Sequence, residues 1–296
     1  DLAGKSVSHL LWADDLVLLA LDGNSLRILL ETLHNYCAEW GLTVNLSKTA
    51  VMVFNSRGRL LKESHNFMFG ETPIPSTREY CYLGVIFSLA GSMKSTQVKL
   101  RQKALRSYFS LKSKIDIRAM SKLTLFQLFD SLVVPVATYG AQVWLPSTGA
   151  VGALLSNKTE PEILRAIAID PLEKLQLTFL KWTLGVGKKT SNCTIWGDTG
   201  RVPLALTAAK QLFGYVKRLI GMRTSNSSSI VRYAFEEQCN LQLPWFKNVA
   251  GLYLRCTGET FDGMHQIIPS AISKRLEKIF VKTWEEARET NRKLGF

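Results

Sequence analysis

Two adjacent aspartates, Asp14 and Asp15, interrupt the apolar run SHLLWADDLVLLA at residues 8–20. A buried strand excludes such a pair, because an isolated carboxylate in an apolar setting carries a large desolvation cost. No basic residue stands close to the pair in the sequence. The pattern therefore predicts a hairpin in which His9–Trp12 and Leu16–Ala20 are antiparallel strands and the residues between them form the connection.

The carboxylates of this connection have two interpretations. A solvated surface turn is one, because aspartate is common in turns. A metal-binding turn is the other, because Mg²⁺ requires hard oxygen ligands and binds through one or two carboxylates together with substrate phosphates. The dipeptide by itself leaves both interpretations open.

The residues around the pair indicate an α+β sheet domain. Leucines at helical spacing predict an amphipathic helix over residues 24–41. Residues 42–54 predict two short strands around a polar bend that contains Lys48. One further pair of strands is expected from residues 67–75 and 79–87, with the prolines of the first segment at an edge.

The charge of the chain is strongly uneven. The 296 residues contain 37 Lys and Arg against 24 Asp and Glu, which gives a net charge of +13. Residues 1–90 carry a net charge of −2, residues 91–150 carry +7 and residues 151–296 carry +8. A balance of this kind indicates a polyanionic partner or an anionic membrane surface, and the basic surface begins after residue 90.

The second part of the sequence is expected to be mainly helical. Residues 93–120 predict a helix that carries most of nine basic residues from Lys94 to Lys122, against Asp116 alone. Its expected apolar stripe is Val98, Leu105, Tyr108, Phe109 and Ile115. A second helix is predicted from Ser121 towards Pro135, a linker at residues 146–157, and further helices beyond it.

The cysteines and the apolar runs indicate in which cellular compartment the protein is expected. Five scattered cysteines suit a reducing compartment, which predicts an intracellular protein of the nucleus or cytoplasm. Cys239, Cys256 and His265 are widely spaced, so ordinary buried thiols are favoured over a zinc site. The apolar runs are too short to span a bilayer, and we expect no membrane partner.

The order of these features resembles the C-terminal part of reverse transcriptases from non-LTR, LINE-type retrotransposons. The likeness covers nearly the whole chain and is carried by ordered motifs: WADD, GLTVNLSKTAVMVF, YLGVIF, LFDSLVVPVATYGAQVW, FLKWTLGV and WGDTGRVPLAL. It implies RNA-directed DNA synthesis with deoxynucleotides, an RNA template and a DNA primer. It also implies Mg²⁺ as cofactor, with Mn²⁺ as the alternative.

The resemblance assigns roles in the polymerase palm. Asp14 and Asp15 would be catalytic carboxylates that hold the metal, with Asp14 as the more direct ligand. Lys48 would donate a proton to the leaving phosphate or pair with its charge; a solvated turn lysine is the alternative. The YLG motif, Tyr82 to Gly84, would form the primer-grip hairpin and contact nucleic acid, whereas plain strand packing is the alternative for Tyr82.

The basic helix would belong to the polymerase thumb. Its candidate contacts to template-primer phosphates are Lys99, Arg101, Lys103 and Arg106. The alternative is a merely solvated basic face. If the helix does not bind, the next candidates are Lys188, Lys189, Lys210, Lys217 and Arg218.

The resemblance also predicts the organisation of the chain. Residues 1–90 would be a partial palm of hairpins and a helix, residues 91–145 the thumb, and residues 146–296 a helical C-terminal region. Only thirteen residues precede Asp14, so we expect the fingers and another palm aspartate to lie in a missing N-terminal partner and the isolated chain to be inactive. The alternative is a non-catalytic nucleic-acid-binding remnant. A glycosyl- or nucleotidyltransferase would leave the basic helix unexplained.

Overall fold

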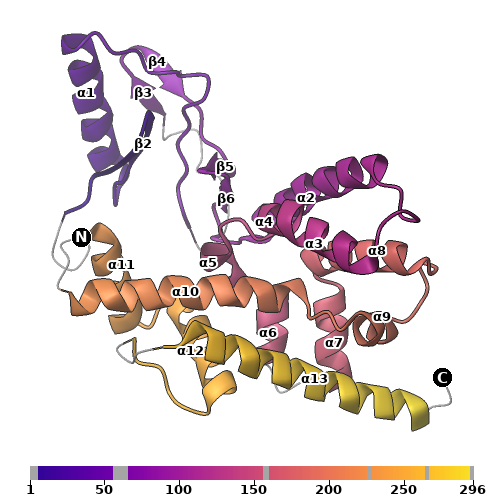
Figure 1. The fold of residues 1–296 in the computed structure, drawn as a ribbon. Coiled ribbons are helices and arrows are strands. Elements are labelled where there is room, and N and C mark those ends of the chain that lie inside the picture. Colours follow the sequence, from indigo (N-terminus) through magenta and orange to yellow (C-terminus); the bar gives the residue numbers. More distant parts are fainter. Residues whose placement is uncertain (1–5, 56–65, 156–159, 226–228, 264–266, 294–296) are drawn as a thin grey trace. The chain divides into compact units, whose positions relative to one another are not determined.

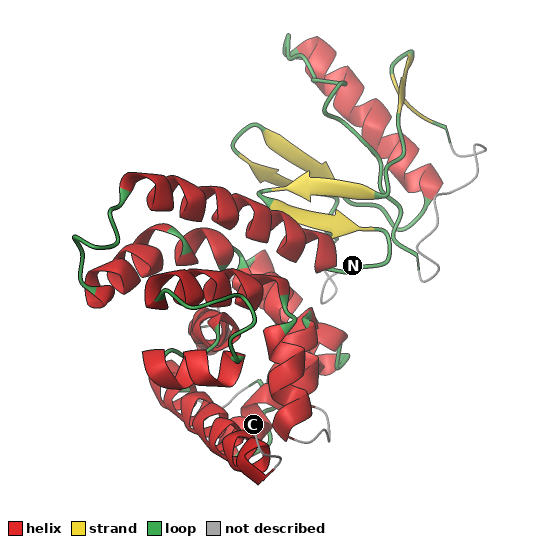
Figure 2. Cartoon of the chain, turned by 90° about the vertical axis from the view of Figure 1, so that its right-hand side faces the viewer, coloured by secondary structure: helices red, strands yellow, loops and turns green. Residues whose placement is uncertain are grey.

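The computed structural model describes residues 6–55, 66–155, 160–225, 229–263 and 267–293 (Figure 1). The chain forms two compact units: Asp1–Met93, called unit 1, and Lys94–Phe296, called unit 2. Strands occur in unit 1, whereas the described part of unit 2 is helical (Figure 2). The predicted α+β class, with hairpins and a helix first and a mainly helical remainder, is confirmed.

Unit 1 contains three antiparallel hairpins, each a separate two-stranded sheet within the part that the structure describes. The pairs are β1 (His9–Trp12) with β2 (Asp15–Leu18), β3 (Phe67–Phe69) with β4 (Thr72–Ile74), and β5 (Glu79–Tyr82) with β6 (Val85–Ser88). The segments 67–75 and 79–87 were expected to pair with each other, but each folds back on itself around a short turn.

The two strands predicted over residues 42–54 are wrong. This segment makes one isolated bridge, between Val51 and Ser76, and no strand. The Val51 N–H donates to the Pro75 carbonyl at 3.0 Å, and the Thr77 N–H donates to the Val51 carbonyl at 2.9 Å. The ladder does not extend towards the N-terminal side of this bridge, because Pro75 has no N–H to donate there.

Helix α1 (Gly23–Glu39), strand β2 and the β3–β4 hairpin share one apolar cluster. The helix begins after Asp22, whose carboxylate accepts hydrogen bonds from the Asn24 and Ser25 N–H groups at 2.8 and 2.9 Å. The cluster consists of the buried side chains Leu30, Val51, Phe67 and Ile74, with Leu18 of β2 packed against it. Burial of these side chains holds the short hairpins to the helix, since a two-stranded ribbon alone is marginally stable.

Unit 2 is a series of helices in chain order. They are α2 (Lys94–Lys114), α3 (Lys122–Leu132), α4 (Val134–Ala137), α5 (Ala141–Trp144), η1 (Leu145–Ser147), α6 (Gly149–Leu155), α7 (Glu160–Ala168), α8 (Pro171–Leu184), α9 (Asn192–Thr199), α10 (Leu204–Thr224), α11 (Ile230–Asn240), α12 (Pro244–Thr257) and α13 (Pro269–Lys293). The predicted linker at residues 146–157 is wrong in its described part. Helix α6 occupies it, with Val151 and Leu154 buried, because its small residues allow close packing against α7 and α12.

An aromatic core joins α2, α3 and α8. Phe129 of α3 stacks on Phe179 of α8 with ring centroids 4.0 Å apart, and Tyr108 of α2 meets the Phe179 ring edge-on at 6.1 Å. The buried residues of α2 recur every four positions, as Leu100, Ala104 and Tyr108. The predicted apolar stripe is therefore largely wrong, since Tyr108 alone among its members is buried and Phe109 is 55% exposed.

One bent helix pair, but no single described helix, has the length and apolar composition of a membrane span. No single described helix is long and apolar enough to cross a membrane. Lys122–Ala137 and Ala141–Ser147, bent by 57° at their junction, meet the length and composition test when they are taken together.

Candidate metal and nucleic-acid site

The aspartate hairpin is tighter than predicted. Asp15 is the first residue of β2 and pairs with Trp12, so the turn consists of Ala13 and Asp14 alone. Ala13 has a φ of 52°, which a two-residue hairpin requires and which costs a non-glycine residue about 1 kcal/mol. Asp14 therefore lies at the tip of the turn, and both carboxylate residues are exposed.

The hairpin is anchored at the end opposite its turn. Leu18 packs on the apolar cluster of α1, β3 and β4, and the Leu19 N–H donates to the Ser8 carbonyl at 2.8 Å. Leu11 and Trp12, near the turn, are 69% and 65% exposed. The burial of one end leaves the acidic end projecting into solvent, where it is open to a ligand.

Lys48 lies in a turn that a tyrosine supports. The Lys48 N–H donates to the Asn45 carbonyl at 3.1 Å, and the exposed side chain of Lys48 belongs to this bend. The Tyr80 hydroxyl of β5 donates to the Lys48 carbonyl at 2.9 Å, across 32 positions of sequence. Tyr80 was not among the predicted site residues, although it stands two positions before Tyr82 on the same strand.

The turn of the β5–β6 hairpin has two residues in the left-handed region. Leu83 has a φ of 46° and Gly84 a φ of 81°. Two positive φ values match the backbone twist of a tight hairpin, and glycine adopts them at little cost. Tyr82 is half-buried and pairs with Val85 across this turn.

The aspartate hairpin alone does not make a closed metal site. Within the described residues, no three or more His, Cys, Asp or Glu side chains lie close enough together to hold an ion. Asp14 and Asp15 could supply oxygen ligands to Mg²⁺, which accepts one or two carboxylates if phosphates and water complete its shell. The pair therefore fits part of a metal site, and the remaining ligands would have to come from elsewhere. Of the cysteines and histidine considered for zinc, Cys239 and Cys256 are buried thiols, and His265 lies outside the described residues.

The four basic residues selected on α2 do not share one face. Lys99, Lys103 and Arg106 follow the i, i+4, i+7 spacing of a single helical face, and we call them the α2 stripe. Arg101 is two positions from both lysines, which places it roughly 200° around the axis. Arg101 is half-buried, and its Nε atom is buried without a hydrogen-bond partner in the structure. A phosphate-binding surface on this helix therefore consists of three charges.

Glu173 is a buried carboxyl in the first turn of α8. Its Oε1 accepts a hydrogen bond from the Trp196 indole at 3.0 Å, and its Oε2 accepts from the Leu204 N–H at 2.8 Å. Glu173 thereby joins α8, α9 and the start of α10. Burial raises the pKa of the Glu173 carboxyl to about 7, although the Leu204 and Trp196 donors oppose the rise.

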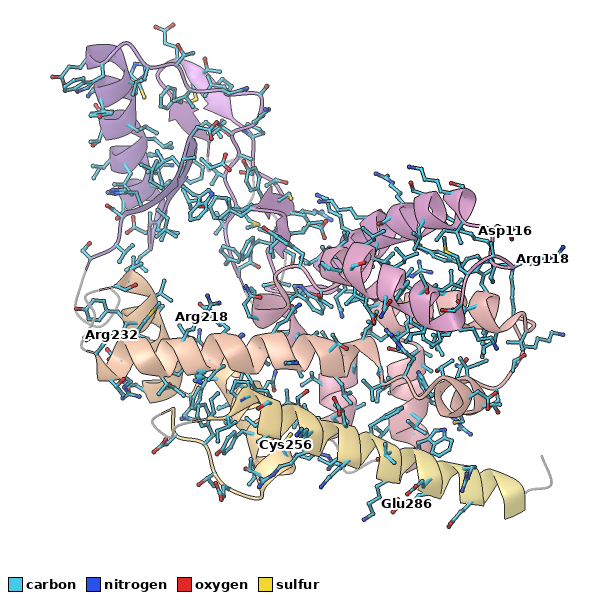
Figure 3. The ribbon with its side chains drawn as sticks, in the orientation of Figure 1. Asp116, Arg118, Arg218, Arg232, Cys256 and Glu286 are labelled. Carbon is cyan, nitrogen blue, oxygen red and sulfur yellow. The ribbon has the colours of Figure 1, made fainter. Side chains whose placement is uncertain are left out.

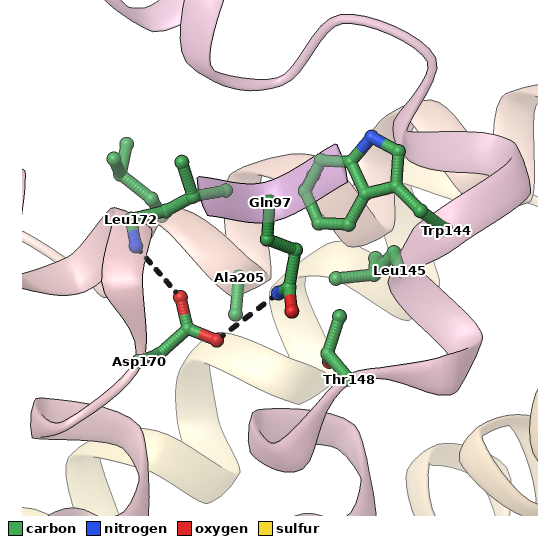
Figure 4. Close-up of a pocket in the computed structure, with 9 residues that line it drawn as sticks. Gln97, Trp144, Leu145, Thr148, Asp170, Leu172 and Ala205 are labelled. Atoms are coloured by element: carbon green, nitrogen blue, oxygen red, sulfur yellow. Dashed lines mark hydrogen bonds between the residues drawn. The ribbon is translucent and has the colours of Figure 1, made fainter. Parts of the chain in front are cut away.

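Asp170 supports the same end of α8. Its carboxylate accepts from the Leu172 N–H at 2.9 Å and from the Gln97 side chain of α2 at 3.3 Å (Figure 4). Burial raises the pKa of Asp170. The adjoining cavity, lined in part by Trp144 and Thr148, has a volume of about 10 Å³, which is room for about one water molecule. A cavity of this size is too small to hold a substrate.

The first third of the chain matches a known family. Residues 1–87 match the family model of reverse transcriptase (RNA-dependent DNA polymerase). An uncharacterized transposon-derived protein of Caenorhabditis elegans is 32% identical over 145 residues, which cover 48% of this chain and 50% of that protein. The chain thus spans about half the length of the curated relative that it matches. No solved structure matches. A reverse transcriptase domain therefore occupies residues 1–87, and the chain is distantly homologous to a transposon-derived protein.

Proposed function

We propose that this chain is the late palm, thumb and C-terminal region of a non-LTR retrotransposon reverse transcriptase. The observation that carries the proposal is the coincidence of the reverse transcriptase match at residues 1–87 with a tight hairpin that projects Asp14 and Asp15 into solvent. In this proposal residues 1–90 belong to the palm, residues 91–145 to the thumb and residues 146–296 to the C-terminal region. Its substrates are an RNA template, a DNA primer and deoxynucleotides.

The carboxylates contribute to phosphoryl transfer in this proposal, but they do not complete it. Phosphoryl transfer between nucleotides relies on metal ions held by several oxygen ligands, which neutralise the developing charge. The described residues bring two neighbouring carboxylates and no third ligand beside them. Lys48, held by Tyr80, supplies a positive charge for a leaving phosphate. We therefore propose that the chain acts with further polymerase segments and does not polymerise by itself.

Nucleic-acid binding is the function that the chain performs alone in this proposal. Unit 2 contains 30 of the 37 lysines and arginines, and the α2 stripe places three of them along one face. Binding to phosphates is independent of sequence and weakens steeply as salt rises, because each contact releases condensed counterions. A non-catalytic remnant with the same binding surface is the second candidate, favoured by the incomplete carboxylate set.

A binding experiment tests the nucleic-acid role. We expect Lys99→Ala, Lys103→Ala and Arg106→Ala together to weaken binding to a labelled DNA primer on an RNA template. The slope of log affinity against log salt should flatten by about one for each lost contact. The matched control removes three exposed lysines that are not candidate contacts, Lys247, Lys274 and Lys278. Fluorescence anisotropy across a salt series measures both, and absence of binding at low salt would contradict the proposal.

A primer-extension experiment separates the two candidates. The isolated chain with Mg²⁺ or Mn²⁺ should incorporate no deoxynucleotide above background. If N-terminal polymerase segments are added in trans, synthesis should appear with the wild-type chain and be lost with Asp14→Ala. Synthesis that Asp14→Ala leaves intact would refute the catalytic role of the hairpin, and no synthesis under any condition would favour the non-catalytic remnant.

A further inference from the structure

One end of unit 2 brings together segments that are distant in sequence. Lys112, in the last turn of α2, holds its Nζ 5.4 Å from the ring centroid of Trp182, in the last turns of α8. Lys181 Nζ donates to the Lys188 carbonyl at 2.9 Å, which ties the loop after α8 to that helix. Figure 1 places this loop and the loop from α2 to α3 at the right-hand end of the unit. We call this region the basic end.

The basic end carries a concentrated positive charge. Its basic residues are Lys112, Lys114, Arg118, Lys122, Lys181, Lys188 and Lys189, of which all except Lys181 are exposed. Within residues 106–125 and 174–190, all of which the structure describes, Asp116 is the single acid. Its carboxylate accepts from the Arg118 N–H at 2.9 Å, and both residues lie on the outer loop (Figure 3). Within the described residues, no ion pair joins any of the seven to a carboxylate.

Helix capping does not explain this distribution. Lys112, Lys114 and Lys181 lie in last turns, where a cation is favoured by the helix dipole. Lys122 is the first residue of α3, however, where the same dipole disfavours a cation. Arg118, Lys188 and Lys189 lie in loops. Four of the seven charges therefore gain nothing from a helix C-terminus, and Asp116 is the single acid among them. An excess of positive charge of this kind indicates an anionic partner.

Apolar side chains lie among the charges. Phe109, one turn before Lys112, is 55% exposed, and Leu123, directly after Lys122, is 66% exposed. Val186, two residues before Lys188, is 39% exposed. Phe109 supplies an exposed aromatic ring beside cations, on which an unpaired base can stack while the phosphates meet the basic side chains. A duplex would offer phosphates alone, since its bases are already stacked.

We propose that the basic end binds a single-stranded segment of nucleic acid, as a surface separate from the α2 stripe. The proposal rests on the proposed function, because the reverse transcriptase match favours a nucleic acid over an anionic lipid surface. The exposed Lys and Arg side chains bind consecutive phosphates, and Phe109 stacks on a base.

The test uses two variants of the full chain with the same change of charge. The end variant carries Arg118→Ala, Lys122→Ala, Lys188→Ala and Lys189→Ala. The control variant carries Lys247→Ala, Lys274→Ala, Lys278→Ala and Lys282→Ala, which are also exposed. Circular dichroism verifies that both fold. Anisotropy of a labelled single-stranded oligonucleotide is then measured across a salt series, beside the primer–template duplex.

The end variant should bind the single strand more weakly, and its salt slope should flatten by about 3 in total, at about 0.7 per lost contact. The control variant should keep the wild-type slope. Phe109→Ala should weaken single-strand binding about 5- to 150-fold without changing the slope, because stacking releases no counterions. Binding of the duplex should depend more on the α2 stripe than on the basic end.

Three results would overturn the proposal. The salt slope could stay unchanged in the end variant while it flattens in the variant that lacks the α2 stripe. That result would refute binding at the basic end but would leave the proposed function supported. Failure of the wild-type chain to bind any nucleic acid would refute both the binding site at the basic end and the proposed nucleic-acid-binding function. The wild type could also bind vesicles of phosphatidylserine and phosphatidylcholine. If only the end variant loses that binding, and its oligonucleotide binding is unaltered, the basic end is a membrane-binding surface.

Discussion

Replacing Glu173 by glutamine should abolish a specific pH dependence of folding. The folded protein holds this carboxyl at a pKa of about 7, against an ordinary value of 4.5, because α8, α9 and α10 bury it completely. Below about pH 4.5 the group is protonated in both states. Between 4.5 and about 7 the folded state keeps the proton and the unfolded state loses it, so rising pH favours unfolding. That interval corresponds to about 3 kcal/mol at ~1.36 kcal/mol per pH unit.

The measurement is urea unfolding followed by far-ultraviolet circular dichroism, which reports mainly the helices of unit 2. The difference in free energy of unfolding between wild type and Glu173→Gln should fall by about 3 kcal/mol from pH 4.5 to 8. Other titrating groups largely cancel in this difference. Glutamine also places an NH₂ group against the Trp196 or Leu204 donor, which adds a cost of about 1–3 kcal/mol at every pH.

The exposed Glu277→Gln variant controls for the loss of one negative charge. A difference between wild type and Glu173→Gln that stays constant with pH would refute the reasoning. It would mean that the hydrogen bonds from Trp196 and Leu204 keep the carboxylate ionised despite its burial. A similar profile in both variants would attribute the effect to net charge.

Two further outcomes are expected. Burial raises the pKa of the Cys239 and Cys256 thiols to about 11 and about 12, so a chromogenic disulfide at pH 8 should modify the exposed Cys81 first and these two only after unfolding; rapid native-state labelling of either would contradict the buried positions. Leu83→Asn, which creates the Asn-Gly turn that two positive φ values favour, should stabilise the β5–β6 hairpin by about 1 kcal/mol, seen as slower backbone amide exchange, and faster exchange would argue that the leucine side chain holds the turn.

Local features were predictable from the sequence because their causes lie within a few residues. The aspartate pair inside an apolar run favours a turn at that point, and Ser121 caps α3 through the Thr124 N–H three positions later. Asp170 before Pro171 starts α8, and Gly185, with a φ of 70°, ends it. The change from acidic to basic composition after residue 90 lies close to the boundary between the two units.

The tertiary structure alone decided which face of each element is buried and which segments meet. Helical spacing allowed α2 to bury either Phe109 or Tyr108, and packing against the Phe129–Phe179 stack selected the face that carries the small Ala104. Glu173 lies in the first turn of α8, where the helix dipole favours an acidic residue, yet partners 23 and 31 positions away make it a buried carboxyl. Lys112 and Trp182 converge for the same reason. Periodicity specifies the local conformation, whereas burial and charge clustering depend on distant chain segments that no local pattern encodes.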